Sequence, residues 1–137
     1  MNTKTLMGAL ITGVLGFLLG WLIFGILLMD YYNANMMQYS GLMKNPPEMW
    51  PIAVANLAWG LLLAYIFNMG GVNTVSKGFT AGFFISLLMA LGFDLFMRAQ
   101  FNLYNAKVLA VDVVVNAIFG GVLGAVLGWW FGRGAKA

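Results

Sequence analysis

Two carboxylates and an arginine interrupt otherwise apolar stretches of this chain. Asp94 precedes Arg98 by four residues, and Asp112 precedes Asn116 by four. Residues four apart lie on the same face of an α-helix. One hypothesis is an ion pair between Asp94 and Arg98 that only stabilises a helix. The other is a proton or cation site, because an acidic side chain inside a membrane is costly unless it serves a function.

Asp112 begins the apolar segment that follows Asp94 in the chain, and Asn116 lies one helical turn further on. A carboxylate in the first turns of a helix also interacts favourably with the helix dipole. Consecutive helices meet at the end where they are connected, so these groups should converge there. We predict a candidate polar or transport cluster of Asp94, Arg98, Asp112 and Asn116.

The segments that carry these residues are long and apolar. Hydrophobic residues make up 62% of the 137, charged residues 8%, and the mean hydropathy is +0.88. A soluble domain carries about 25% charged residues, and a membrane span needs roughly 20 apolar residues. We predict an all-α fold, a four-helix transmembrane bundle that forms a single domain over residues 1–137. The predicted spans are residues 6–29, 50–68, 78–97 and 108–131.

Small or polar residues recur at every fourth position along each predicted span. In lipid, such a face is where another helix packs closely. Asn56 and Asn116 are each expected to form a hydrogen bond across a helix interface, because an unpaired amide is costly there. The residues predicted to mediate helix packing are Gly16, Gly20, Asn56, Gly60, Gly120, Gly124 and Gly128.

The second and fourth spans align with each other. Residues 55–60 read Ala-Asn-Leu-Ala-Trp-Gly, and residues 115–120 read Val-Asn-Ala-Ile-Phe-Gly. Two repeated helical hairpins, related by an axis along the membrane normal, would explain this match. Chance similarity between apolar segments would explain it equally well, so both interpretations stay open.

Charged residues are unevenly distributed between the two ends of the predicted bundle. Counted on lysine and arginine, the positive-inside rule favours cytoplasmic termini, with residues 30–49 outside. The termini side holds Lys4, Lys77, Arg133 and Lys136, and the other side holds Lys44, Arg98, Lys107, Asp30, Glu48, Asp94 and Asp112. The net charge of +3 is spread over both ends, so we expect membrane anchoring and no nucleic-acid partner.

The composition restricts the available chemistry. Cysteine and histidine are both absent, so thiolate zinc sites, iron–sulfur clusters and histidine-ligated haem are excluded from this chain alone. No phosphate-binding loop or nucleophile elbow occurs. We therefore predict a protein that is not an enzyme and needs no cofactor or metal. Five methionines between residues 29 and 49 leave two interpretations, an apolar lid or a Cu(I) site.

Several short motifs together resemble a known group of proteins. They are Gly20-Trp21, Phe24-Gly25, Tyr39-Ser40-Gly41, Ala64-Tyr65, Gly92-Phe93, Asp112 and Leu123-Gly124-Ala125-Val126-Leu127-Gly128-Trp129. With these motifs, the chain resembles small bacterial four-span membrane proteins classified as a domain of unknown function. The resemblance covers nearly the whole chain, and it implies four helices in a bacterial inner membrane. It implies no activity.

Two functions are compatible with these features. The first is a structural or accessory subunit without enzymatic activity, which contacts membrane lipid. The second is an oligomeric small-solute or ion channel or transporter, with a polar site near the outer ends of the third and fourth helices. We expect a homo-oligomer or membership of a membrane complex, because so short a chain should leave a glycine face of its first or fourth span uncovered. A dry bundle with Asp94 paired to Arg98 would favour the first function, and a solvent path to the cluster would favour the second.

Overall fold

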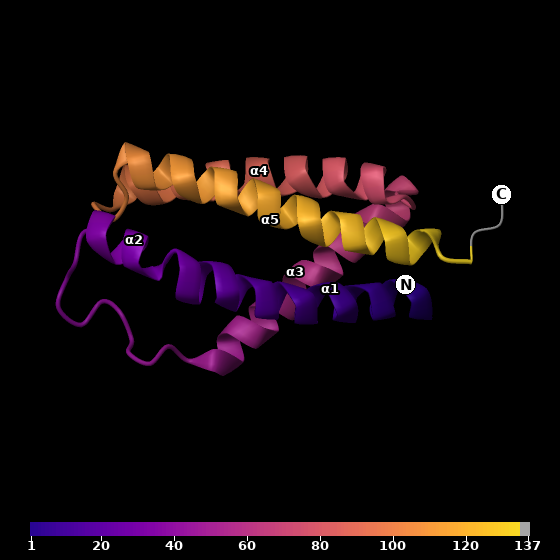
Figure 1. Cartoon of the computed structure of the whole chain (residues 1–137), viewed down its shortest axis with the longest axis horizontal. Helices are drawn as coiled ribbons and strands as arrows, with labels where there is room; N and C mark the ends of the chain where they lie inside the picture. The colour runs from indigo at the N-terminus through magenta and orange to yellow at the C-terminus, as the bar shows by residue number, and fades with distance from the viewer. Residues whose placement is uncertain (135–137) are drawn as a thin grey trace.

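The structure, a computed structural model, describes residues 1–134 and is helical without strands over that range (Figure 1). Its elements are α1 (Thr3–Leu22), the π-helix η1 (Ile23–Leu27), α2 (Met29–Asn35), α3 (Met49–Gly70), α4 (Val75–Gln100) and α5 (Ala106–Gly132). Four segments are long and apolar enough to cross a membrane: Thr3–Leu27, Met49–Gly70, Val75–Gln100 and Ala106–Gly132. The predicted all-α, four-helix class is confirmed, and it indicates an integral membrane protein.

Capping residues explain where the long helices begin and end. Asn2, Thr74 and Asn105 each accept a hydrogen bond from a backbone N–H three residues later, at the starts of α1, α4 and α5. These side chains satisfy donors that have no partner within the helix. Gly71 ends α3 with φ of +64°, a left-handed conformation that glycine adopts without a steric cost.

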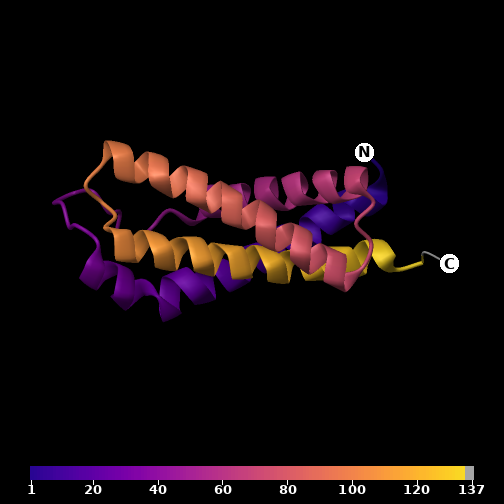
Figure 2. The ribbon, with the colours of Figure 1, turned by 90° about the horizontal axis from the view of Figure 1, so that it is seen from above.

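The four long helices alternate in direction, so the start of α1, the end of α5 and the 71–74 connection lie at one end of the molecule (Figures 1 and 2). The 36–48 and 101–105 connections lie at the opposite end, called the outer end below because the sequence predicts that it lies outside. Helix α1 packs mainly on α3, and α4 packs mainly on α5, while α1 also contacts α5. The bundle is therefore two helical hairpins that meet through α1, α3 and α5. Their shared core consists of Ala9, Leu63, Ala64, Phe67 and Leu127.

Helices α4 and α5 approach each other backbone to backbone. A Cβ atom placed on Gly82 would overlap the carbonyl oxygen of Gly120, and one placed on Gly124 would overlap that of Gly78. A Cβ atom placed on Gly128 would likewise overlap the carbonyl oxygen of Thr74. Small residues permit this approach, which lets van der Waals contact hold helices together in lipid.

The α1–α3 hairpin has one comparably close point. A Cβ atom on Gly60 would overlap the carbonyl oxygen of Ala9, and one on Gly16 would lie 3.0 Å from the side-chain oxygen of Asn56. Gly20 is looser than predicted, because a Cβ atom there would lie an ordinary 3.8 Å from Phe119.

Every glycine of α1 and α5 is packed against another part of this same chain. A Cβ atom placed on any of them would meet a neighbouring atom within 4 Å. Other parts of the bundle therefore cover the glycines of α1 and α5, whereas Gly25 of η1, within the predicted first span, is exposed and meets only Trp21. Oligomer formation stays a prediction.

Polar contacts also join the two ends of the chain. Lys4 Nζ donates to the backbone oxygens of Phe131 at 2.8 Å and Arg133 at 2.7 Å. Trp130 Nε1 donates to the backbone oxygen of Lys4 at 2.9 Å. The start of α1 and the end of α5 share one end of the bundle, as an even number of spans requires. Lys136, which entered the orientation prediction, lies outside the described residues.

Candidate functional site

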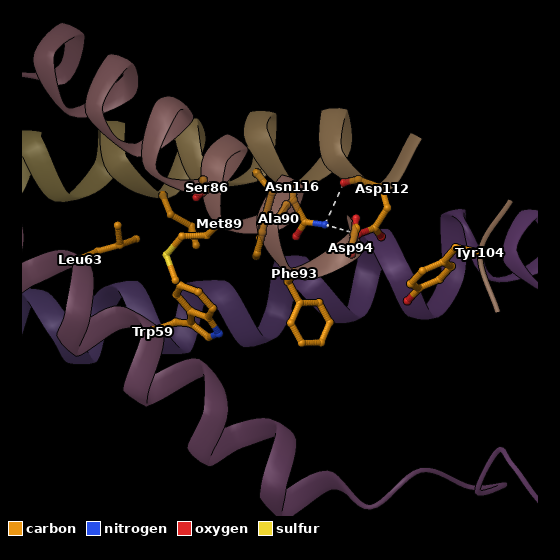
Figure 3. Close-up of a pocket in the computed structure, with 13 residues that line it drawn as sticks. Trp59, Leu63, Ser86, Met89, Ala90, Phe93, Asp94, Tyr104, Asp112 and Asn116 are labelled. Carbon is orange, nitrogen blue, oxygen red and sulfur yellow. Dashed lines mark hydrogen bonds between the residues drawn. The ribbon is translucent and has the colours of Figure 1, made fainter. Parts of the chain in front are cut away.

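Carboxyl, amide and phenol groups converge at the outer end of the α4–α5 hairpin (Figure 3). Asp94 extends from α4, and Asp112 and Asn116 extend from α5, with Tyr104 beside them. Asn116 Nδ2 donates to the backbone oxygen of Asp112 at 2.8 Å and to its Oδ2 at 3.0 Å. The hydroxyl group of Tyr32, from α2, donates to Asp112 Oδ1. The structure thus brings together three of the four residues predicted for this cluster.

Asp94 is the most buried polar group of the cluster. Its residue surface is only 2% exposed, and within residues 1–134 its Oδ2 atom has no hydrogen-bond partner. Its carboxyl group and that of Asp112 lie side by side at the same end of one cavity (Figure 3). Two facing carboxylates repel each other in an apolar environment, and a buried charge without a partner is costly. The pair is therefore suited to hold a proton or a cation between its oxygens.

Arg98 does not join the cluster. Its Nη1 donates to the backbone oxygen of Tyr104 at 3.0 Å, and its side chain is exposed. Within residues 1–134, the salt bridge of the structure joins Lys44 and Glu48 at 2.7 Å and does not involve Asp94 or Arg98. The hypothesis of an Asp94–Arg98 ion pair is wrong. Arg98 lies one turn nearer the outer end, where a long cationic side chain can remain hydrated.

The two asparagines also differ from expectation. Asn56 Nδ2 donates to the backbone oxygen of Ile52 at 2.8 Å, as Asn116 does to that of Asp112, so both amides bond within their own helix. The prediction of bonds across helix interfaces is wrong, because a carbonyl one turn back lies within reach of the amide. The two residues form the same local bond, which any asparagine in a helix can form, so it does not distinguish a repeat from chance similarity. The repeat itself stays a prediction.

A cavity of about 360 Å³ reaches this cluster from the side of the bundle. Helix α3 diverges from α4 towards the outer end, and the cavity lies where the two separate (Figures 1 and 3). Trp59 and Met89 lie at one end, Asp94 and Asp112 at the other, and Phe93 between them (Figure 3). The remaining lining residues are Leu63, Ser86, Ala90, Tyr104, Asn116, Phe119, Gly120 and Leu123.

Residues 30–49, which are predicted to lie outside the membrane, cover the cluster only in part. Asn105 Nδ2 donates to the backbone oxygen of Asn35 at 3.1 Å, and Lys107 Nζ lies 5.9 Å from the centre of the Tyr31 ring. These contacts hold α2 against the 101–105 connection. Residues 39–48 are exposed, and Met43 is 68% exposed, so the predicted apolar lid is limited to α2.

Two tyrosines of the cluster, Tyr32 and Tyr104, did not emerge from the sequence pattern. Both resemble ordinary interfacial tyrosines, which are common at membrane boundaries. Their approach depends on the π-helix η1 and on the 101–105 connection, whose paths the sequence pattern does not reveal. Burial is the largest cause that raises the pKa of each phenol, followed by the neighbouring Asp112 carboxylate.

This environment predicts a pH dependence at alkaline pH. The pKa of Tyr32 is raised above its ordinary value of 10.0, so the folded protein keeps this phenol neutral while the unfolded chain ionises it. The free energy of unfolding should therefore fall as the pH rises above 10. Tyr32→Phe should flatten that part of the profile, measured by chemical unfolding in detergent between pH 8 and pH 11, relative to Tyr39→Phe as a control. Equal alkaline slopes in both variants would contradict the burial of this phenol.

No group of three or more carboxylate, histidine or cysteine ligands occurs within residues 1–134. Together, the fold and the cluster define an integral membrane protein of four helices with a carboxyl pair beside a lateral cavity. No protein-family model matches the chain, and neither a curated protein nor a solved structure is significantly similar to it.

Proposed function

We propose that this protein is a non-enzymatic carrier of small solutes, in which the Asp94–Asp112 pair binds the transported cation. One observation supports this proposal above the others. Asp94 faces a cavity of about 360 Å³, and its buried Oδ2 has no hydrogen-bond partner among the described residues. An ionisable side chain placed within a span in this way is costly to fold, which is the expected signature of an ion or solute pathway.

The carrier would operate in a bacterial inner membrane, with both termini in the cytoplasm and the cluster near the outer surface. It would act as an oligomer. The excess of basic residues on the termini side, four against three, and the resemblance to small bacterial four-span proteins support this location. In this orientation, the carboxyl pair receives its solute from the outer half of the bilayer.

A structural or accessory role is the second candidate, and the inner half of the molecule favours it. From Gly78 to Gly82, α4 lies against the backbone of α5, so the space between these two helices is closed there. A carrier would therefore have to move its hairpins relative to each other. An accessory subunit would need no such movement.

The two functions differ in charge movement across the membrane. The protein is reconstituted into liposomes adsorbed on a sensor, and the external solution is switched to sodium, potassium or 2-phenylethylammonium chloride at constant pH. A carrier should produce a transient current with at least one salt, and Asp94→Asn should reduce that current at least tenfold. Asp30→Asn, which changes an exposed carboxylate on α2, should retain it.

Either of two results would overturn the carrier. One is a wild-type current no larger than that of protein-free liposomes with all three salts, and this result would support the accessory role. The other is an Asp94→Asn current equal to the wild-type current.

A further inference from the structure

We infer that the cavity binds the ammonium group of an amphipathic amine, which enters from the lipid between α3 and α4. Transport of this amine rests on the proposed function, whereas its binding in the cavity does not. The chemistry of the cavity wall indicates the class of substrate. Three features support it: the size of the cavity, its polarity and the position of its mouth.

The size of the cavity fits an organic molecule. Its volume of about 360 Å³ greatly exceeds the roughly 30 Å³ that one water molecule occupies in the liquid. Pockets for organic ligands span roughly 300–1,000 Å³. A bare inorganic cation would leave most of this space unfilled, whereas a small alkyl or aryl body would fill it.

The polar end of the cavity offers acceptors and lacks a cation. Asp94 Oδ2 has no partner among residues 1–134, and the Asn116 amide nitrogen is already bonded to Asp112, which leaves the Asn116 side-chain oxygen to accept. Arg98 is directed to the backbone oxygen of Tyr104, and no lysine or arginine of the described chain lines this cavity. The positive charge and the N–H donors must therefore come from the ligand. A primary ammonium supplies both, and it forms short, charge-assisted hydrogen bonds to carboxylates.

The cavity has aromatic walls and opens towards the side of the bundle. Trp59, Phe93 and Phe119 supply ring surfaces, which attract cations and cover apolar bodies. Trp59 is 45% exposed and Phe93 is 63% exposed on the side surface of the bundle. Because that surface faces lipid in a membrane protein, a ligand dissolved in the bilayer can reach the carboxyl pair without crossing water.

A primary ammonium on an apolar body has two sources, a free amine and the headgroup of an aminophospholipid. The ammonium chemistry is the same in both. Titration of the purified protein in detergent separates them, with 2-phenylethylammonium as the free amine and a short-chain phosphatidylethanolamine as the lipid. The neutral 2-phenylethanol and a short-chain phosphatidylcholine are the matched controls that lack an ammonium N–H donor.

Tryptophan fluorescence and titration calorimetry then measure binding. We expect at least one ammonium ligand to bind tenfold or more tightly than its matched control. Asp94→Asn should weaken that binding at least tenfold, and Asp30→Asn should leave it unchanged. Ala90→Leu fills the cavity without altering a carboxyl group, so it should also abolish binding in a protein whose helical circular dichroism is unchanged.

Equal binding of ammonium ligands and controls would overturn the inference, as would an Asp94→Asn or Ala90→Leu variant that binds normally. The outcomes for the two proposals are separable. Ammonium binding without any solute-induced current would overturn the carrier and support the binding site. A sodium or potassium current that depends on Asp94, without ammonium binding, would support the carrier and overturn the amine as its substrate.

Discussion

Gly82→Ala should lower the free energy of unfolding by about 3 kcal/mol, the upper end of the cost of overpacking a close interface. The physical reason is that the added methyl group would overlap the Gly120 carbonyl oxygen, which belongs to the backbone and cannot rotate away. Helices α4 and α5 must then separate along their whole length. The measurement is reversible unfolding in mixed detergent micelles, followed by circular dichroism.

Gly92→Ala provides the control on the same helix. Apart from its own helix backbone and its chain neighbours, no described atom lies within 4 Å of a Cβ atom at Gly92, so the methyl group meets open space. The variant should be neutral, or more stable by up to about 1 kcal/mol, because alanine favours helix more than glycine does. Equal destabilisation by the two substitutions would show that helix–helix contact is not what makes Gly82 sensitive.

Asp94→Asn should raise the free energy of unfolding by about 1–2 kcal/mol, even though it abolishes the proposed activity. Asparagine has the same shape, but it removes a buried charge without a partner in the described chain and can donate to the facing Asp112 carboxylate. A functional group that is costly to the fold is common at binding sites, where stability is lost in favour of activity. The same detergent unfolding assay measures the change.

Asp112→Asn should have the opposite sign and lower the free energy of unfolding by about 1–3 kcal/mol. Asp112 accepts hydrogen bonds from Tyr32 and Asn116, and an amide in its place could accept only on its oxygen. Two neighbouring carboxylates should therefore respond in opposite directions to the same substitution. A loss of stability in both variants would indicate that Asp94 has a structural partner and no ligand role.

Part of the polar cluster follows from helical periodicity. Asp112 and Asn116 are four apart on one helix, so spacing alone predicts that they share a face. Their mutual hydrogen bond replaces the predicted bond across a helix interface. Asp94 joins them because consecutive antiparallel helices meet at the end where they are connected. Arg98 has the same spacing but a long side chain, which reaches outwards to the Tyr104 backbone oxygen. Spacing restricts where a side chain begins, and the length of the side chain decides where its charged end lies.

Tyr32 illustrates what local pattern cannot reveal. It lies 80 residues from Asp112 in the chain, and it reaches that carboxylate only because η1 and α2 continue α1 past the end of α5. The cavity has a similar origin. It exists because α3 diverges from α4, and the angle between two helices depends on how all their side chains fit together.

The amino-acid pattern alone specifies four apolar helices that span a membrane, because their length and composition leave no other way to satisfy their backbone polar groups in lipid. It also specifies that glycines at every fourth position lie on shared helix faces, since that spacing matches the helical repeat. The packing of the whole chain selects which faces meet, turns Arg98 away from Asp94 and opens a cavity beside the carboxyl pair. Those outcomes depend on contacts between residues distant in the chain, which the local period of a helix does not specify.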